Sequence, residues 1–178
     1  MTISNLVPKA LLVTLATFTF NHAHAEPLSR SSTIMVKRFD VEDADLGKSK
    51  HQDTARAMAK AAPHLVAVDI AQFLRRDGFI NVILDESDEQ PGAEAVVLSG
   101  RFTTIKPGSQ AMRVWVGFGA GHSEVCTEVE LTAADGELMH SFDICNSGIG
   151  WGDSKSNLGD EAKHLGHKIA DKIASLAS

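Results

Sequence analysis

The chain has 178 residues, of which 43% are hydrophobic and 22% charged, and its formal net charge is −6. These proportions are typical of a globular protein and exclude a disordered, collagen-like or coiled-coil chain. The acidic balance argues against binding to nucleic acids or anionic membrane surfaces, because phosphates select patches of lysine and arginine.

Residues 1–25 have the pattern of a secretory signal peptide. Lys9 is their only charged residue, an uncharged apolar run follows it, and Ala23-His24-Ala25 offers small residues to a signal peptidase. The apolar run is shorter than the roughly 20 residues that span a bilayer. An N-terminal helix that stays attached is the alternative. We expect cleavage after Ala25, with no cysteine nearby for a lipid anchor, and a periplasmic or secreted product without a transmembrane segment.

The remaining chain is expected to have a polar leader at residues 26–32 and a single domain at residues 33–178. Runs of β-branched residues predict strands, and apolar residues at three- and four-residue spacing predict helices. In chain order these are a strand (Thr33–Phe39), a helix (Asp53–Arg76), two strands (Phe79–Leu84, Ala95–Ile105), a pair of hairpin strands (Val125–Leu131, Leu138–Ile144) and a helix (Asn157–Leu176). The order β-α-β-β-β-β-α predicts an α/β (α+β) two-layer sandwich, with two helices on one face of a mixed five-stranded sheet.

The first predicted helix contains a proline and is followed by residues typical of a helix C-terminus. Pro63 should kink the helix or divide it in two, because proline lacks the N–H that a helix needs. Arg75 and Arg76 suit the negative end of the helix dipole, and Gly78 is expected at the position just after the helix. The acidic segment 40–52 before this helix is expected to be a solvated loop.

Cys126 lies in the predicted strand before Asp135-Gly136, and Cys145 directly follows the predicted strand after it. Asp-Gly between two strand-like runs predicts a two-residue type I′ turn. That register places the cysteines directly opposite each other, at a hydrogen-bonded pair with Cα atoms ~5.5 Å apart, whereas a three-residue loop would put them on opposite faces. In an oxidising compartment such a pair usually forms a structural disulfide, and two free thiols are the alternative.

Segment 109–123 is the most distinctive part of the chain. Its alternating glycines either let backbone N–H groups surround an anion or make one face of a strand flat. Neither a P-loop nor a dinucleotide-binding pattern matches. Its two aromatic residues would anchor a partner protein if exposed, and would otherwise pack in the core. The residues of this expected binding surface are Arg113, Trp115, Gly117, Phe118, Gly119, Gly121 and His122.

The last predicted helix carries Asp160, His164, His167 and Asp171 on one stripe. Imidazole and carboxylate groups at this spacing can hold Zn²⁺ or another divalent ion. Because the stripe faces away from the apolar side of the helix, a solvated polar face is the alternative. No hydrolase signature or other catalytic motif is present, so we expect no enzyme activity and no cofactor.

A Gly-Ser-x-Ala-x-Arg lead precedes a Val-Gly-Phe-Gly-Ala-Gly run, at Gly108, Ser109, Ala111, Arg113 and Val116–Gly121. This pattern and the Asp-Gly turn after it resemble the uncharacterised bacterial domain-of-unknown-function family 4410, over about residues 33–174. The family brings no known activity. The element order is also similar to the amino-terminal domain of TolB and to the curli-secretion lipoprotein, which implies protein contacts in the cell envelope. We therefore expect a non-enzymatic module that binds an unidentified protein or envelope component; the alternative is small-ligand or metal binding.

Overall fold

The computed structural model describes residues 27–47, 52–85, 91–106, 123–148 and 158–177, with Thr54, Gly148 and residues 158–162 described by their backbone alone. Its strands are β1 (Thr33–Lys37), β2 (Asn81–Asp85), β3 (Ala95–Lys106), β4 (Ser123–Ala133) and β5 (Leu138–Gly148), and its helices are α1 (Gln52–Arg76) and α3 (Leu158–Leu176). The predicted order of elements is confirmed.

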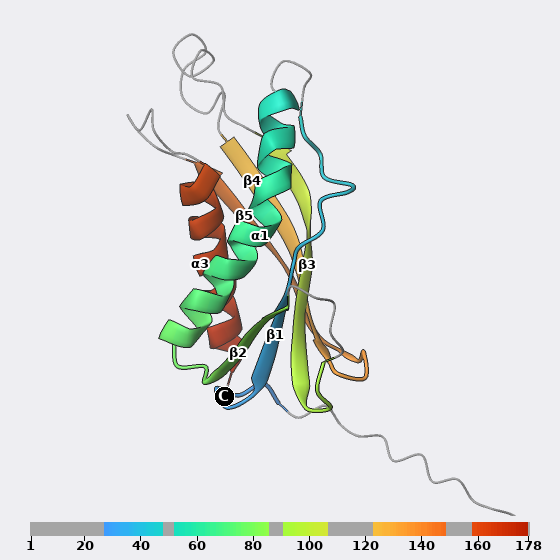
Figure 1. The fold of residues 1–178 in the computed structure, drawn as a ribbon, viewed down its shortest axis with the longest axis vertical. Coiled ribbons are helices and arrows are strands. Elements are labelled where there is room, and N and C mark those ends of the chain that lie inside the picture. The colour runs from blue at the N-terminus through green and yellow to red at the C-terminus, as the bar shows by residue number, and fades with distance from the viewer. Residues whose placement is uncertain (1–26, 48–51, 86–90, 107–122, 149–157, 178) are drawn as a thin grey trace, which may run out of the picture.

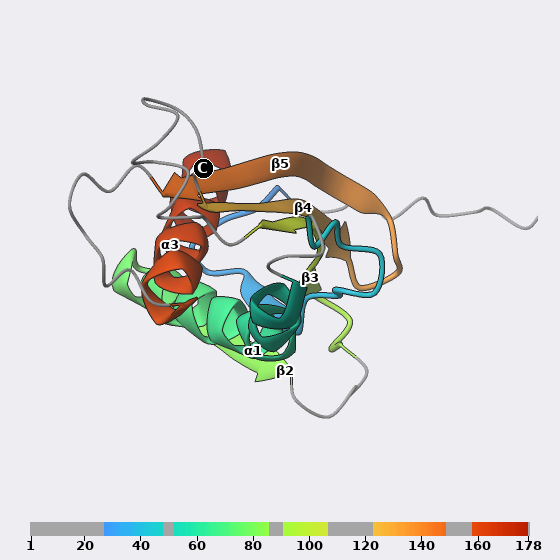
Figure 2. The ribbon, with the colours of Figure 1, turned by 90° about the horizontal axis from the view of Figure 1, so that it is seen from above.

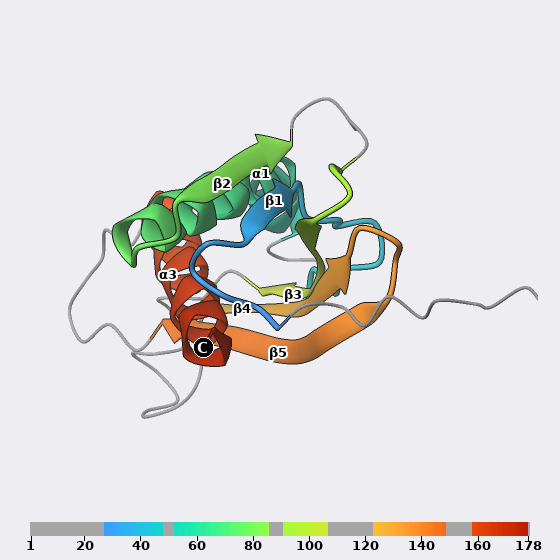
Figure 3. The same ribbon diagram turned by 90° about the horizontal axis from the view of Figure 1, so that it is seen from below.

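The five strands form one mixed sheet in the order β2-β1-β3-β4-β5. β1 runs parallel to both β2 and β3, while β3, β4 and β5 are antiparallel neighbours. Figure 1 and Figure 2 show both helices on one side of this curved sheet, and Figure 3 shows the same arrangement from below. The predicted fold class, two helices on one face of a mixed five-stranded sheet, is therefore confirmed.

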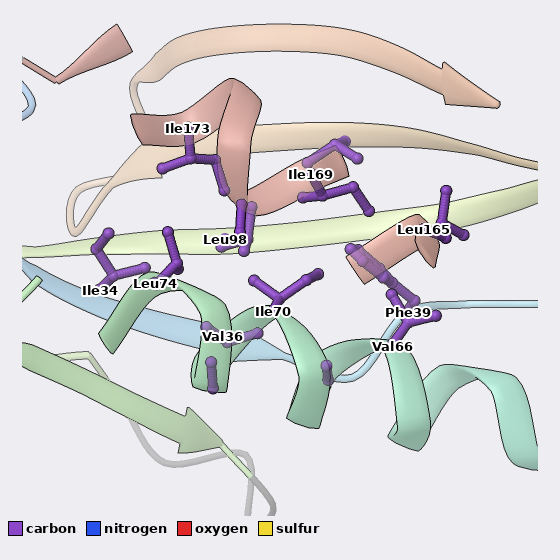
Figure 4. Packing of buried hydrophobic residues seen from close by; sticks show 14 of the residues in the cluster. Ile34, Val36, Phe39, Val66, Ile70, Leu74, Leu98, Leu165, Ile169 and Ile173 are labelled. Atoms are coloured by element: carbon purple, nitrogen blue, oxygen red, sulfur yellow. The ribbon is translucent and has the colours of Figure 1, made fainter. Parts of the chain in front are cut away.

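The core lies between the two helices and the sheet. Both helices turn the apolar stripes that the sequence predicted toward the strands, and Figure 4 shows how closely these side chains interlock. Burial of each large aliphatic side chain contributes about 1.5–3 kcal/mol, so this layer supplies most of the stability. None of the helices in the described ranges is long and apolar enough to cross a bilayer. Fully buried members of the cluster include Ile34, Val36, Val66, Ile70, Leu74, Leu98, Leu165, Ile169 and Ile173.

The end of α1 confirms one sequence prediction and corrects another. Gly78 has a φ of 95°, its N–H donates to the Arg75 carbonyl (3.2 Å), and the Phe79 N–H donates to the Leu74 carbonyl (3.0 Å). These two bonds are a Schellman cap, with Gly78 at the predicted position. The sequence predicts that Pro63 kinks the helix or divides it in two. Division does not occur, since α1 continues through this residue, and the kink stays a prediction. Tertiary packing of the apolar stripe outweighs the one hydrogen bond that proline removes.

The residues on both sides of β1 take part in the fold more than the sequence predicted. Leu28, in the polar leader, is 2% exposed and belongs to the core. After β1, Asp40 and Asp45 form isolated parallel bridges with Arg101 and Thr104 of β3, so this acidic segment is not simply a solvated loop. The reason is its apolar residues, because Val41, Ala44 and Leu46 pack against the core between the acidic ones.

Candidate functional site

The β4–β5 hairpin brings Cys126 and Cys145 together, as the sequence predicted. The two residues are register partners and their sulfur atoms are bonded. The predicted turn is wrong, however. The Gly136 N–H donates to the Ala133 carbonyl (2.9 Å) and the Ala133 N–H to the Glu137 carbonyl (2.8 Å), which closes a three-residue loop with Gly136 at positive φ. This is a type I turn followed by a glycine bulge, a common alternative to type I′.

A second irregularity explains why the cysteines still meet. Thr132 pairs with Leu138 but Leu131 pairs with His140, so Met139 is an extra residue in β5. This bulge restores the register that a three-residue loop alone would have shifted. Alternation along the strand predicts Leu138 on the same apolar face as Phe142 and Ile144. The bulge corrects this, because Leu138 is 55% exposed while Met139 packs against the core.

The disulfide lies on the face of the sheet away from the helices. Val125, Thr127 and Val129 alternate with Cys126 along β4 and are buried toward the helices. The Cα atoms of Cys126 and Cys145 are 4.1 Å apart, which fits the ~4.5 Å of a non-hydrogen-bonded pair and corrects the hydrogen-bonded pair expected from the turn. The Cys145 carbonyl agrees with this geometry, since it accepts a hydrogen bond from Lys168 of α3 (3.0 Å).

Strand β3 ends, β4 begins and β5 ends at the same end of the sheet, which we call the loop end. There Lys106, the last residue of β3, pairs with Glu124 of β4, and Ser123 pairs with Gly148, the last residue of β5. Both helices begin toward this end (Figure 1). Segment 107–122 connects β3 to β4 here. All seven residues of the expected binding surface, from Arg113 to His122, belong to this segment and lie outside the described residues.

An ion pair ties the acidic segment after β1 to the loop end. The Lys106 Nζ lies 2.7 Å from Asp45 Oδ2 and 4.0 Å from Glu124 Oε2. The hydrogen bond from Lys106, with a second from the Gly47 N–H, lowers the pKa of Asp45, and the same bond raises the pKa of Lys106. Both side chains are exposed, so the ion pair contributes little to the free energy of folding. It does hold the acidic segment next to the end of β3. Sequence reasoning missed it, since the two residues are distant in sequence.

The helix stripe proposed for a metal is engaged in a different set of contacts. The His167 ring stacks on Phe73 of α1 (centroids 4.4 Å apart), and its Nε2 lies 3.3 Å from Asp171 Oδ1 and 3.2 Å from Arg76 Nη2. His164 is exposed, and the side chain of Asp160 is outside the described part. No three His, Cys, Asp or Glu groups gather as metal ligands in the described ranges. Phe73 and Arg76 were not foreseen, because they reach the stripe from the other helix.

Several solved structures are similar to this chain, and the two with TM-scores above 0.5 support the fold. A PelC dodecamer from Paraburkholderia phytofirmans matches with a TM-score of 0.54 and 18% identity, covering 86% of this chain and 94% of that one. A single-substitution variant of the same dodecamer gives 0.53 and 18%, with coverages of 84% and 92%. A Xanthomonas campestris protein described as DUF330 gives 0.48 and 7%, with coverages of 85% and 86%. TolB is not among these structures, so that likeness stays a prediction.

No curated protein matches the chain. A family match covers the first strand, the first helix and the whole β2–β5 region, and it ends just before α3. It includes the glycine-rich segment whose residues carried the resemblance noted from the sequence. The family is described as Domain of unknown function (DUF4410), it matches residues 34–156, well over half of the chain, and the protein therefore belongs to it.

Proposed function

We propose that this protein is an exported, non-enzymatic module of the cell envelope that binds a protein or envelope component at the loop end. The residues assigned to the contact are those of segment 107–122 that the sequence singled out. The observation that carries the proposal is the length of this segment between two paired strand ends.

The β3–β4 connection is much longer than its geometry requires. Lys106 and Glu124 are direct register partners, so a tight turn would join their strands. The next hairpin of the same sheet shows this, because Ala133 and Glu137 are joined by a three-residue loop. Connections beyond about 12–15 residues are uncommon in compact domains and are usually either functional or linker segments. The length of segment 107–122 therefore supports a binding role at this end.

The composition of the insertion favours a protein partner. Trp115, Phe118 and Arg113 are residue types enriched at the centres of protein interfaces, and they stand here among glycines. Glycines beside an aromatic side chain let another backbone approach closely. A partner that inserts between these aromatics would gain most of its affinity from one or two of them.

The disulfide supports the proposed location. Cys126 and Cys145 are bonded to each other, and disulfides persist in oxidising compartments such as the periplasm. A bond between adjacent strands of one hairpin has a structural role, since the cysteines form no Cys-x-x-Cys redox motif. Export, indicated by residues 1–25, and the disulfide therefore support the same compartment.

A second copy of this chain is one partner to test. The PelC structures with this fold are dodecamers. Sedimentation velocity of the purified mature chain over a wide concentration range distinguishes a monomer from a defined oligomer. A dodecamer would give one discrete large species, whereas binding to a different protein leaves the isolated chain monomeric.

The binding surface is tested by cross-linking in a periplasmic extract, identification of partners by mass spectrometry, and affinity measurement with the purified partner. Trp115→Ala should weaken binding by roughly 30-fold, the effect of removing one interface hot spot. Ile80→Ala is the matched control, because Ile80 is also a large apolar residue and is 77% exposed, but it precedes β2, away from the loop end. Equal partner yields and affinities for wild type and Trp115→Ala would overturn the proposed surface.

A further inference from the structure

We infer that both outer edges of the sheet are closed to strand addition by a basic side chain that each helix places on an edge carbonyl. Arg75 of α1 does so on β2, and Lys168 of α3 does so on β5. Because this inference rests only on contacts between described residues, it is independent of the proposed function.

The β2 edge has the features of a strand that invites pairing. Among the described strands β2 is hydrogen-bonded to β1 alone, and it is bordered by Ile80 (77% exposed) and carries Ile83 (48% exposed). Exposed apolar side chains on an edge strand favour pairing with another chain, because an edge also presents outward N–H and C=O groups. Here the Val82 carbonyl accepts a hydrogen bond from Arg75 Nη2 at 2.7 Å.

The position of Arg75 follows from the way α1 ends. The Schellman cap at Gly78 reverses the chain, so that β2 starts a few residues after the last turn of the helix. The guanidinium of Arg75 thereby reaches the strand that immediately follows its own helix. In a parallel ladder the carbonyl groups of successive residues point to opposite sides of a strand. Carbonyls that face β1 are used by the ladder, so the bond from Arg75 assigns the Val82 carbonyl to the set that faces outward.

The opposite edge is protected in the same manner by the other helix. β5 has 11 residues and pairs with β4 alone among the described strands. The Cys145 carbonyl points out of the ladder and accepts a hydrogen bond from Lys168 Nζ at 3.0 Å. Two different helices thus each contribute one cation to one edge. Basic side chains are a known device against edge-to-edge association.

An incoming strand meets two obstacles at β2. It must displace a charge-assisted hydrogen bond, which is stronger than the neutral backbone bond that would replace it. If the incoming strand is β2 of a second copy, two-fold symmetry also brings the two Arg75 guanidinium groups to the same seam, where they repel each other. Contacts with partners, including copies of this chain, are therefore expected on the faces or at the loop end.

The test replaces the cation and keeps its aliphatic stem. Arg75→Met should let β2 edges pair, with a dimer dissociation constant at least about tenfold below the wild-type value by sedimentation velocity, the factor expected for one charge-assisted hydrogen bond. Hydrogen exchange should show new protection of the Val82 and Leu84 amides in this dimer. Arg56→Met is the matched control, because Arg56 lies on the same helix, carries the same charge and contacts only Gln52 and Asp53 of its own helix among the described residues.

A second substitution keeps the test decisive. Adding Ile83→Lys to Arg75→Met puts a charge on the opened edge and should return the protein to the wild-type state. Lys168→Met should open β5 in the same way, with new amide protection in that strand. The inference is wrong if folded Arg75→Met and Lys168→Met keep the wild-type association state and exchange pattern. It is equally wrong if Arg56→Met associates as strongly as Arg75→Met.

Discussion

Gly100 shows how the absence of a side chain can organise a core. A Cβ built at this position would lie 2.7 Å from the Cδ1 of Phe39 and 2.8 Å from the Glu128 carbonyl oxygen. Without it, the Phe39 ring rests on the backbone of β3 and meets Phe102 edge to face, with centroids 6.0 Å apart. Such aromatic pairs add stability beyond their buried area. The close contact therefore requires glycine for space, not for backbone freedom.

Gly100→Ala should lower the free energy of unfolding by about 1–3 kcal/mol, the range for overpacking a well-packed core. Neither neighbour can retreat cheaply, since one is a buried ring and the other is backbone of β4. Urea denaturation measures the effect. Gly92→Ala is the control, because a Cβ there meets nothing within 4 Å, and it should change stability by less than about 0.5 kcal/mol. Equal stabilities for the two variants would show that Phe39 has room to move.

Asp69 gives a pH-dependent prediction at the contact of α1 with α3. Burial raises the pKa of Asp69, and the charge of Lys163 only partly opposes this effect. The folded state therefore holds its proton more tightly than the unfolded state does, so stability is lost as the pH rises from below the ordinary pKa of Asp through the raised one. Asp69→Asn removes this loss and should be more stable than wild type at pH 7, by less than about 1 kcal/mol because the group is partly exposed.

The pH profile separates this cause from a change in packing. The stability difference between Asp69→Asn and wild type should vanish toward pH 3, where both side chains are neutral in either state. Thermal unfolding followed by circular dichroism across this range measures it. Asp171→Asn, at an exposed position on α3, provides a surface comparison. A constant difference at every pH would assign the effect of Asp69→Asn to altered contacts with Gly166, whose missing side chain allows the close approach.

At the scale of elements, the hairpin that carries the disulfide should depend on it. The bond joins residues 19 apart in sequence and restricts the unfolded chain, which corresponds to about 3 kcal/mol for a loop of this size. Replacing both cysteines with serine should lower the free energy of unfolding by about this amount, measured by urea denaturation. Wild type kept in reductant should behave like the double variant. Unchanged stability in both would mean that the Lys168 contact and the strand pairing alone hold β5.

The sequence predicted the features of each element that depend on residues close together in the chain. It missed those that depend on contacts between distant segments. Apolar spacing within one segment located the helices and strands, and a glycine after the last helical turn located the cap at Gly78. The hairpin turn was predicted with the wrong length, because Asp-Gly suits both a two-residue and a three-residue loop. The bulge at Met139 restores the register that the longer loop would have shifted, and no local sequence signal predicts this bulge. Pro63 does not divide α1, because packing of the apolar stripe on both sides of it favours a continuous helix.

The same limit applies to the candidate sites. The cysteine pairing could be predicted because one short turn relates the two residues. The contacts of Lys168 and His167 depend on which helix lies beside which strand or helix, and the sequence pattern does not contain that information. The residues of segment 107–122 were chosen by composition alone, so the binding surface remains a prediction.

At the scale of the whole molecule, the two ends of the sheet differ in how the chain connects its elements. The end at which α1 and α3 finish carries the Schellman cap, the Arg75 contact and the first residues of β1 (Figure 1). The loop end carries the long β3–β4 connection and the Asp45–Lys106 pair. Binding residues often lie on loops that a rigid scaffold positions, which is why we propose the binding surface at the loop end.

Removal of residues 1–25 should leave this fold intact. The first core side chain in the described ranges is Leu28, and the first strand begins at Thr33, so cleavage after Ala25 takes no contact from the described core. Expressed with its leader in a Gram-negative host, the protein should be recovered from the periplasm with Glu26 as its first residue and a mass lower by two hydrogens for the disulfide. Intact-mass spectrometry with and without reductant measures both features. Ala25→Lys, which removes the small residue that a signal peptidase requires, should leave the leader attached. Recovery of the wild-type chain from the cytosol with Met1 present and both thiols free would contradict export, and with it the compartment assigned to the binding partner.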